Sequence, residues 1–225
     1  RVMNQDLPAP AVPGRGFVLS GAGEGREQLL SLSIGDRIVL GEETVQFFVP
    51  ATMTTAVSAF VNPILPEVQQ RILAIIREIM AYDLDGIVLD RARYARVTAD
   101  FSPASRRAFE AFLGETIQRW PEDILSVQVR PGLTGPELGS LASLWFLWRA
   151  SVIRDFVLQV RRLIDTYRPD LELGAYVGSW YHEYYSEGAN WARQGYQPPL
   201  DWAHEEFHTT GFGDLLDFLM AGTYY

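Results

Sequence analysis

The sequence contains no cysteine among its 225 residues. Disulfide bonds, thiolate zinc sites and cysteine nucleophiles are therefore excluded. Positive charge is also scarce, because 19 Lys and Arg stand against 28 Asp and Glu, which gives a formal net charge of −9. A basic patch is the usual footprint of a protein that binds nucleic acid or an anionic membrane, so neither partner is expected. No apolar run approaches the ~20 residues that cross a bilayer, so no membrane span is expected.

Apolar side chains, by contrast, are abundant. Hydrophobic residues make up 48% of the chain and aromatic residues 12%. The chain is therefore long and apolar enough to bury one sizeable core. The aromatic surplus fits either a large α/β core or the lining of a sugar-binding cleft, because aromatic rings serve in both.

Two regions differ in their local patterns. Residues 1–50 begin with a Pro/Gly-rich stretch and continue with short apolar runs between turns, which predicts a β-rich N-terminal segment. Residues 51–225 alternate helical and strand patterns, which predicts βαβ units and a parallel sheet. Helices are expected at 66–80, 103–113 and 144–167, parallel strands at 86–90, 171–178 and 217–223, and a further strand at 123–129.

The number of strands leaves two architectures open. A closed eight-fold β/α barrel typically takes ~250 residues. The second region offers only four or five convincing strands of the barrel type. Either part of a barrel is missing, or the sheet is open.

The phrase VNPILPEVQQRILAIIREIMAYDLDGIVLDRARY, residues 61–94, resembles the family-10-like glycosyl hydrolases. Those proteins are TIM barrels built around a phrase like NPxxPEVR…YDVDGIxLDxxRY, and the resemblance covers about residues 55–225. It implies an α/β fold of the (β/α)8 TIM-barrel type, either complete or with part of the barrel missing, behind a short β-rich N-terminal segment. It also implies a glycoside hydrolase that acts on a polysaccharide or oligosaccharide by carboxylate acid/base catalysis. Residues 14–40 are similar, over a short stretch, to the end of a phosphodiester-glycosidase domain.

Asp90 is the leading candidate for a catalytic carboxylate. It ends the apolar run GIVLD just before a polar loop, and parallel α/β folds carry their sites at the carboxyl ends of the strands. The alternative is that Asp90 caps the loop or pairs with Arg91 or Arg93. Asp85 is a poor partner, because an extended strand would separate it from Asp90 by about 16 Å. The carboxyl pairs of glycosidases lie about 5 to 10 Å apart.

Arg93 and Tyr94 follow Asp90 and are expected to bind substrate. Arg93 is further expected to orient Asp90 through a charge-assisted hydrogen bond and to keep it ionised. The alternative for Arg93 is a solvated loop arginine without a functional role.

The segment GSWYHEYYSEG, which leaves the strand at 171–178, supplies the second set of candidates. It offers Glu183 and Glu187, and Glu183 is taken as the second catalytic carboxylate. Trp180, Tyr181 and Tyr224 are expected to line the cleft, because sugar faces stack on such rings while a nearby carboxylate does acid–base work. The alternative is a surface loop fixed by aromatic packing.

The segment HEEFHTTGFGD, 204–214, fits the H-E-x-x-H pattern of zinc proteases, so a zinc-dependent metzincin-like peptidase is an alternative function. That chemistry needs two histidines one turn apart on a firm helix. GYQPPLD allows a helix to begin only at about residue 201, and FHTTGFG ends it soon after. The segment is therefore expected to be a loop, with no metal and no cofactor. A third alternative is a non-catalytic carbohydrate-binding or envelope-associated module.

Overall fold

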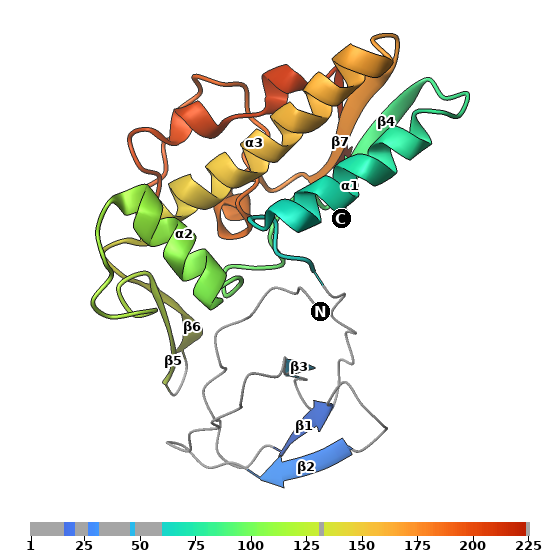
Figure 1. The fold of residues 1–225 in the computed structure, drawn as a ribbon. Coiled ribbons are helices and arrows are strands. Elements are labelled where there is room, and N and C mark those ends of the chain that lie inside the picture. The colour runs from blue at the N-terminus through green and yellow to red at the C-terminus, as the bar shows by residue number, and fades with distance from the viewer. Residues whose placement is uncertain (1–15, 21–26, 32–45, 48–59, 131–132, 224–225) are drawn as a thin grey trace.

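The computed structural model describes residues 16–20, 27–31, 46–47, 60–130 and 133–223 (Figure 1). In the N-terminal region, β1 (Gly16–Ser20), β2 (Glu27–Ser31) and β3 (Gln46–Phe47) form an antiparallel sheet in the order β2-β1-β3. The elements from α1 to β8 follow and carry the candidate site.

A parallel sheet forms the centre of this second region. It consists of β4 (Gly86–Asp90), β7 (Glu172–Gly178) and β8 (Phe218–Gly222), in the order β4-β7-β8. Both strand pairs are parallel, so the parallel pairing predicted from the alternating pattern is confirmed. Helices α1 (Pro66–Ile79) and α3 (Ala142–Tyr167) lie side by side against one face of the sheet (Figure 1).

Alternation along the strands decides which side chains meet the helices. In β4, Ile87 and Leu89 are buried in the core with α1 and α3, whereas Val88 and Asp90 are exposed on the opposite face. This is the two-residue period of a strand whose successive side chains point to opposite faces. The core between the sheet and the two helices is built from Ile76, Met80, Ile153, Phe156, Val157, Val160, Ile164, Leu173, Ala175 and Val177, together with the two β4 residues.

The middle of the chain forms a second core beside the sheet. Helix α2 (Pro103–Leu113) begins as the sequence predicts, with Ser102 as N-cap and Pro103 in the first turn, and Gly114 ends it in the left-handed conformation at φ 74°. Its Phe109 packs edge to face on Trp145 of α3, with 4.9 Å between the ring centroids. The helix therefore packs against the N-terminal part of α3.

The strand predicted at 123–129 exists, but it does not join the parallel sheet. β5 (Leu125–Arg130) pairs antiparallel with β6 (Leu133–Leu138), which follows it directly in the chain. The expected (β/α)8 barrel is accordingly found only in part, because the parallel sheet has three strands in the described ranges and stays open. A short run of strand-forming residues does not identify the partner of the strand or its direction, because β-propensity reflects how side chains fit a sheet surface.

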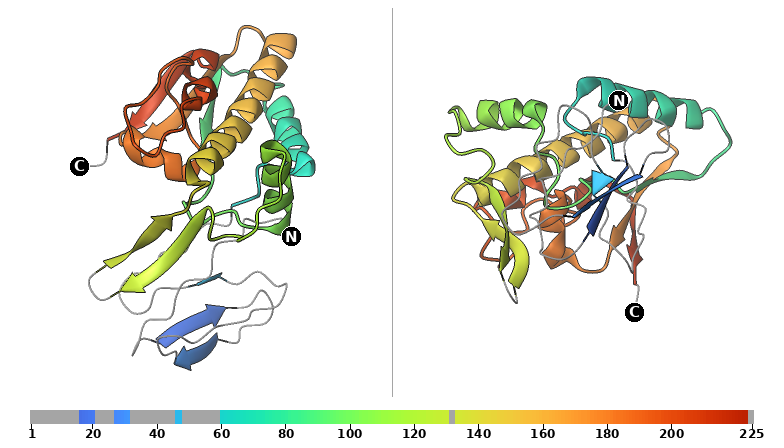
Figure 2. Two further views of the ribbon diagram at one scale, coloured as in Figure 1. Left: turned by 90° about the vertical axis from the view of Figure 1, so that its left-hand side faces the viewer. Right: turned by 90° about the horizontal axis from the view of Figure 1, so that it is seen from below.

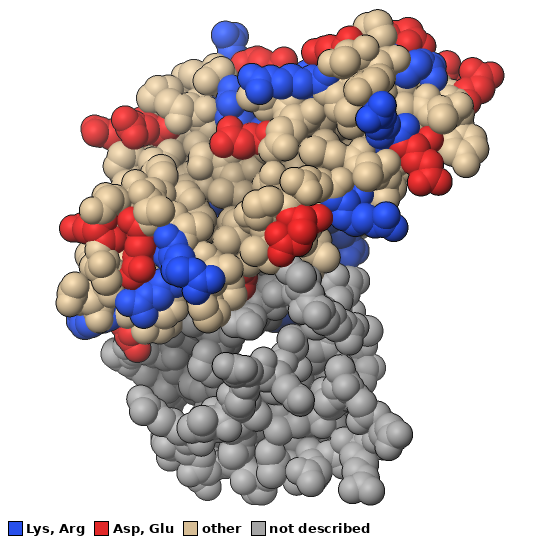
Figure 3. Space-filling view, in the orientation of Figure 1, with Lys and Arg blue, Asp and Glu red and all other residues tan. Residues whose placement is uncertain are grey.

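The C-terminal segment covers the other flank of α3. Its short helical turns are η1 (Tyr181–Glu187), η2 (Phe207–Thr210) and η3 (Gly213–Leu215), and all three contact α3. Helix α3 thus lies between α1 and this segment (Figure 2). On the face shown in Figure 3, acidic and basic side chains are interspersed over the described helices.

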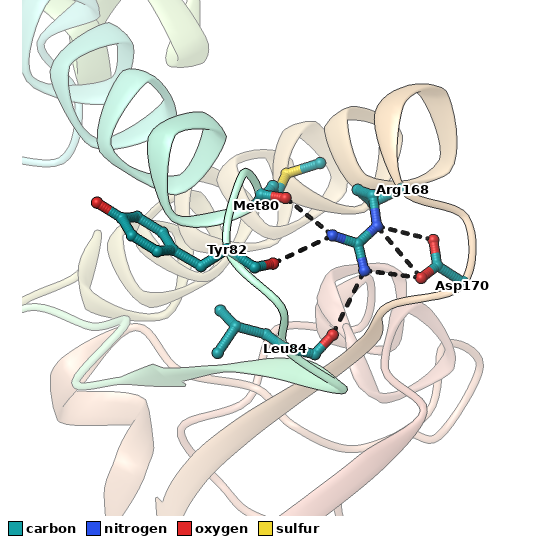
Figure 4. Close-up of polar contacts among 5 residues, drawn as sticks. All are labelled: Met80, Tyr82, Leu84, Arg168 and Asp170. Atoms are coloured by element: carbon teal, nitrogen blue, oxygen red, sulfur yellow. Dashed lines mark hydrogen bonds and ion pairs between the residues drawn. The ribbon is translucent and has the colours of Figure 1, made fainter.

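Arg168 follows α3 directly and connects the segment before β7 with the loop between α1 and β4 (Figure 4). Its guanidinium donates to the carbonyl oxygens of Met80 (2.9 Å), Tyr82 (3.3 Å) and Leu84 (3.4 Å) in the loop between α1 and β4. It also contacts Asp170 with an Nη2–Oδ2 distance of 2.8 Å. Hydrogen bonding to Asp170 raises the pKa of Arg168 and lowers the pKa of Asp170.

We expect Arg168→Lys to lower the thermal midpoint of unfolding. One ammonium group is a point charge and cannot reproduce a planar fork that contacts three carbonyls and a carboxylate at once. Differential scanning calorimetry of this variant should be compared with Arg162→Lys, which changes an exposed arginine in the last turns of α3. Equal midpoints for the two variants would show that the contacts of the Arg168 guanidinium do not stabilise the fold.

Candidate functional site

Asp90 lies at the carboxyl end of β4, on the face of the sheet that is turned away from α1 and α3. The chain turns sharply after it. Arg91 takes the left-handed conformation at φ 56°, and the Arg93 amide donates to the Arg91 carbonyl at 2.8 Å. The Asp90 side chain is exposed, and no ion pair or hydrogen bond joins its carboxylate to another side chain in the described part of the chain. A carboxylate so placed is available to a bound molecule.

The strand register places Tyr176 and Met220 in line with Asp90. Asp90 pairs with Tyr176 of β7, and Tyr176 pairs with Met220 of β8. Paired residues of neighbouring parallel strands point to the same face, about 4.8 Å apart along the sheet. The three side chains therefore form one row across the open face, at the level of the strand ends.

The sequence interpretation does not include Tyr176, although the sequence contains a signal for it. It is the central residue of GAYVG, and a period of two puts Gly174 and Gly178 on its own face. Both glycines are closely approached: a Cβ at Gly174 would overlap the Phe218 ring, and one at Gly178 would overlap the Tyr184 hydroxyl. Two glycines flanking one aromatic residue on a strand mark a face where other groups pack directly on the backbone.

Arg93 does not orient Asp90, so this part of the sequence interpretation is wrong. The Nη1 of Arg93 lies 2.9 Å from Oε1 of Glu187 and also donates to the carbonyl oxygens of Tyr94 (3.2 Å) and Ala95 (3.3 Å). The sharp turn at Arg91 redirects the chain after β4, which carries Arg93 toward the segment that follows β7. The loops after β4 and β7 are therefore joined by an ion pair at the carboxyl ends of the strands.

Glu187 is the half-buried carboxylate of this region. Burial raises the pKa of the Glu187 carboxyl above its ordinary value, whereas the charges of Arg93 and Arg149 oppose the rise and the charge of Glu183 adds to it. Its backbone is held as well, because the Tyr94 amide donates to the Glu187 carbonyl at 2.8 Å. A carboxyl group with a raised pKa retains its proton to higher pH, as a general acid requires.

Glu183, the second catalytic carboxylate expected from the sequence, is placed differently. Its side chain is 68% exposed, and its carboxylate lies 3.5 Å from Nε2 of His182. It belongs to η1, one turn before Glu187. Of the two glutamates that the sequence offers here, Glu187 is the one that contacts the loop after Asp90.

The aromatic candidates divide into exposed and packed side chains. Trp180 is 37% exposed and lies 6.3 Å from Tyr184 between ring centroids. Tyr181 is half-buried: it packs edge to face on Trp191 at 5.0 Å and donates its hydroxyl to Oδ1 of Asn190 at 2.7 Å. Burial raises the pKa of Tyr181 above its ordinary value. Tyr224 lies outside the described residues.

Tyr94 cannot contact a substrate as the sequence interpretation expected, because its side chain is 0% exposed. Its ring lies under the guanidinium of Arg149, with 4.1 Å from Cζ to the ring centroid. The hydroxyl has no hydrogen-bond partner among the described residues, and burial raises the pKa of Tyr94 far above its ordinary value. Tyr94 is a core residue beneath the loop, which the pattern DRARY does not reveal.

Asn190 anchors the segment after η1 to the segment after Trp202. Its Oδ1 accepts from the Tyr181 hydroxyl (2.7 Å) and the Ala192 amide (3.2 Å). Its Nδ2 donates to the Phe207 carbonyl (3.3 Å) and to Oγ1 of Thr210 (3.0 Å). The side chain is completely buried, so all of its hydrogen-bonding capacity is used inside the protein.

We expect Asn190→Ala to lower the free energy of unfolding by about 2–4 kcal/mol, since it leaves several buried donors and acceptors unsatisfied. Urea denaturation followed by tryptophan fluorescence measures this loss. The exposed substitution Gln118→Ala is the control and should stay within about 0.5 kcal/mol of the parent. A similar small effect at Asn190 would show that water replaces the lost bonds.

The HEEFH segment forms a loop rather than the helix of a zinc protease. The only helical turn there is η2, which begins at Phe207, so His204 and His208 do not share the face of one helix. Nδ1 of His204 accepts from the Glu206 amide (3.2 Å), and Nδ1 of His208 lies 2.9 Å from the Glu205 carbonyl. Phe207 between them is buried against Trp202, at 5.1 Å between ring centroids. The segment's contacts therefore describe an anchored loop, and the zinc-peptidase alternative has no geometric support.

Across the described residues, no group of three or more His, Asp or Glu side chains is arranged to hold a metal ion. The helices in those same ranges include none that is both long and apolar enough to cross a membrane.

The elements from α1 to β8 thus form an α/β fold in which Asp90 and Glu187 lie at and after the carboxyl ends of two neighbouring parallel strands. Comparison with protein families gives a match to the glycosyl hydrolase-like 10 model over residues 43–198. The chain belongs to the glycosyl hydrolase-like 10 family, and the resemblance drawn from residues 61–94 is confirmed. The resemblance of residues 14–40 to a phosphodiester-glycosidase domain stays a prediction.

Two further proteins are similar to this chain. An S-layer-related protein of Niallia circulans is 36% identical over 181 residues, a match that takes in 74% of this chain and 11% of the relative. This chain thus spans only a small part of that protein's length. The glycoside hydrolase domain of PgaB (BpsB) from Bordetella bronchiseptica has a TM-score of 0.49 and 15% sequence identity, covering 77% of this chain and 42% of that chain.

Proposed function

We propose that this chain is a glycoside hydrolase domain that acts on a polysaccharide or oligosaccharide through Asp90 and Glu187. The observation that carries the proposal is the connection between the loops after β4 and β7. The Arg93–Glu187 ion pair and the Tyr94–Glu187 backbone bond join a half-buried glutamate to the loop that begins at Asp90. Family membership supports a carbohydrate as the substrate class.

The two carboxyl groups suit different roles in this reaction. Glu187, with its raised pKa, would protonate the leaving oxygen as general acid. Asp90, exposed at the strand end, would act as nucleophile or general base. Glu183 is the alternative acid, and the comparison of Glu183→Gln with Glu187→Gln separates the two.

The sugar would lie on the row formed by Asp90, Tyr176 and Met220. Trp180, which follows β7 shortly after Tyr176, would extend this surface. Aromatic rings stack on the apolar faces of sugars, and Trp180 is partly exposed. Arg93 would act through Glu187 rather than through the substrate. Tyr181 and Tyr224 keep the substrate-binding role expected from the sequence as a proposal.

The test is a panel of polysaccharides incubated with the purified protein, with release of new reducing ends as the readout. Cell-envelope polysaccharides belong in the panel because a relative is an S-layer-related protein. Release that depends on Asp90 supports the proposal. Binding of a glycan by calorimetry without any release would instead support the non-catalytic carbohydrate-binding alternative, which the openness of the three-stranded sheet in the described residues favours.

A further inference from the structure

Arg149 of α3 is a completely buried cation, and three of its contacts lie in the loop after β4. Its Nη2 donates to the Arg96 carbonyl at 3.0 Å, and its Nη1 donates to the Val97 carbonyl at 3.3 Å. Its Cζ lies 4.1 Å from the centroid of the Tyr94 ring. A buried guanidinium is costly unless such contacts offset its loss of hydration, so these three contacts fix both the arginine and the loop.

The same arginine also adjoins the segment that follows β7. Gly188 takes the left-handed conformation at φ 68°, and a Cβ there would lie 3.0 Å from Cδ2 of Tyr94 and 3.1 Å from Cβ of Arg149. The residue before it, Glu187, accepts the backbone hydrogen bond of Tyr94. The Arg149 and Tyr94 side chains therefore fill the junction at which the two loops meet.

We infer that Arg149 is a positioning residue that sets the placement of Glu187 relative to the loop that begins at Asp90. It acts through Tyr94. The guanidinium contacts the Tyr94 ring and the carbonyl oxygens of Arg96 and Val97 in the loop after β4. The Tyr94 amide in turn donates to the Glu187 carbonyl. The charge of Arg149 also opposes the rise of the Glu187 pKa, but the arginine that pairs with the Glu187 carboxylate at 2.9 Å is Arg93. Its catalytic consequence rests on the proposed function, whereas its structural consequence does not.

The first arm of the test is amide hydrogen exchange at Tyr94, whose N–H bridges the two loops. In Arg149→Lys, exchange of this amide should become about tenfold faster or more, because one ammonium group replaces neither the two-carbonyl fork nor the full cation–π contact. The amides of the β4–β7 ladder serve as the internal reference and should keep their exchange rates. A uniform increase at both places would show general destabilisation and would overturn the inference.

Two substitutions of Tyr94 keep the inference testable if Arg149→Lys does not fold. Tyr94→Leu removes the ring from under the guanidinium and should speed exchange at residue 94 in the same way. Tyr94→Phe keeps the ring and removes only a buried hydroxyl that lacks a partner among the described residues, so the rate should stay near that of the parent. Equal rates in the Leu and Phe variants would overturn the role of the cation–π contact.

The second arm uses a glycan that the parent cleaves. Arg149→Lys should lower kcat about tenfold or more with KM nearly unchanged, and should shift the basic limb of the pH profile, because the environment of Glu187 changes. If the pH profile of kcat is unchanged while the Tyr94 amide exchanges faster, Arg149 stabilises the loops but does not position Glu187 for catalysis. A parent that is inactive on every glycan would count against the proposed function alone, since the exchange arm does not depend on activity.

Discussion

Asp90→Asn is expected to lower kcat/KM for glycan hydrolysis by at least about 10³-fold, a loss typical of removing a group that reacts with the substrate. The substitution is nearly isosteric but deletes the charge, and the exposed Asp90 side chain forms no hydrogen bond or ion pair with another side chain among the described residues. The free energy of unfolding of Asp90→Asn should therefore stay close to that of the parent. Initial rates of reducing-end release, measured beside a denaturation curve, check both statements.

Asp85→Asn is the matched control for Asp90→Asn. Asp85 is also exposed and precedes the same strand, but it lies at the opposite, amino-terminal end of β4, where its carbonyl accepts from the Glu172 amide. The same chemical change there should leave the rate of hydrolysis unaltered. Retention of activity in Asp90→Asn, or an equal loss in Asp85→Asn, would refute the assignment. Glycan binding should survive in both variants, since stacking on rings rather than this carboxylate is expected to supply most of the affinity.

Glu187→Gln is expected to have the second largest effect, a loss of about 10²–10⁴-fold in kcat, as for removal of a general acid. The parent should lose activity as pH rises through the raised pKa of Glu187, because the carboxyl must be protonated to act as acid. The variant should lack this basic limb, since an amide does not titrate in that range. Rates measured from pH 4 to 9 test the shape of the profile. Glu183→Gln is the matched control: a larger loss there would transfer the role to Glu183.

The same group predicts how stability depends on pH. The folded-state pKa of Glu187 is raised by burial, so the folded protein binds its proton more tightly than the unfolded chain does. The resulting contribution is fully present below the unfolded value of about 4.3 and is lost as pH rises through the folded pKa. As pH rises through that window, the parent should therefore lose stability relative to Glu187→Gln. The measured quantity is the difference between their free energies of unfolding. A difference independent of pH would show that the Arg93 ion pair cancels the burial effect.

The sequence by itself determined the local elements and the position of Asp90. Ser102, Pro103 and Gly114 define the ends of α2 through capping chemistry that depends only on neighbouring residues. The run GIVLD predicts a strand in a parallel sheet with a carboxylate at its carboxyl end, since the alternation of helices and strands requires such a sheet. Family membership follows from the same phrase.

The tertiary structure alone decided which of these residues meet. The partner of Arg93 depends on the left-handed turn at Arg91 and on the segment that follows β7, about 90 residues later, so no local pattern identifies Glu187. The burial of Tyr94 depends on Arg149, which arrives from α3. β5 pairs with β6 in a hairpin and does not join the parallel sheet, which strand propensity could not predict because it does not encode the partner of a strand or its direction. Contacts between residues distant in sequence depend on how whole helices and strands pack together. The periodicity of a sequence predicts those elements but not their packing.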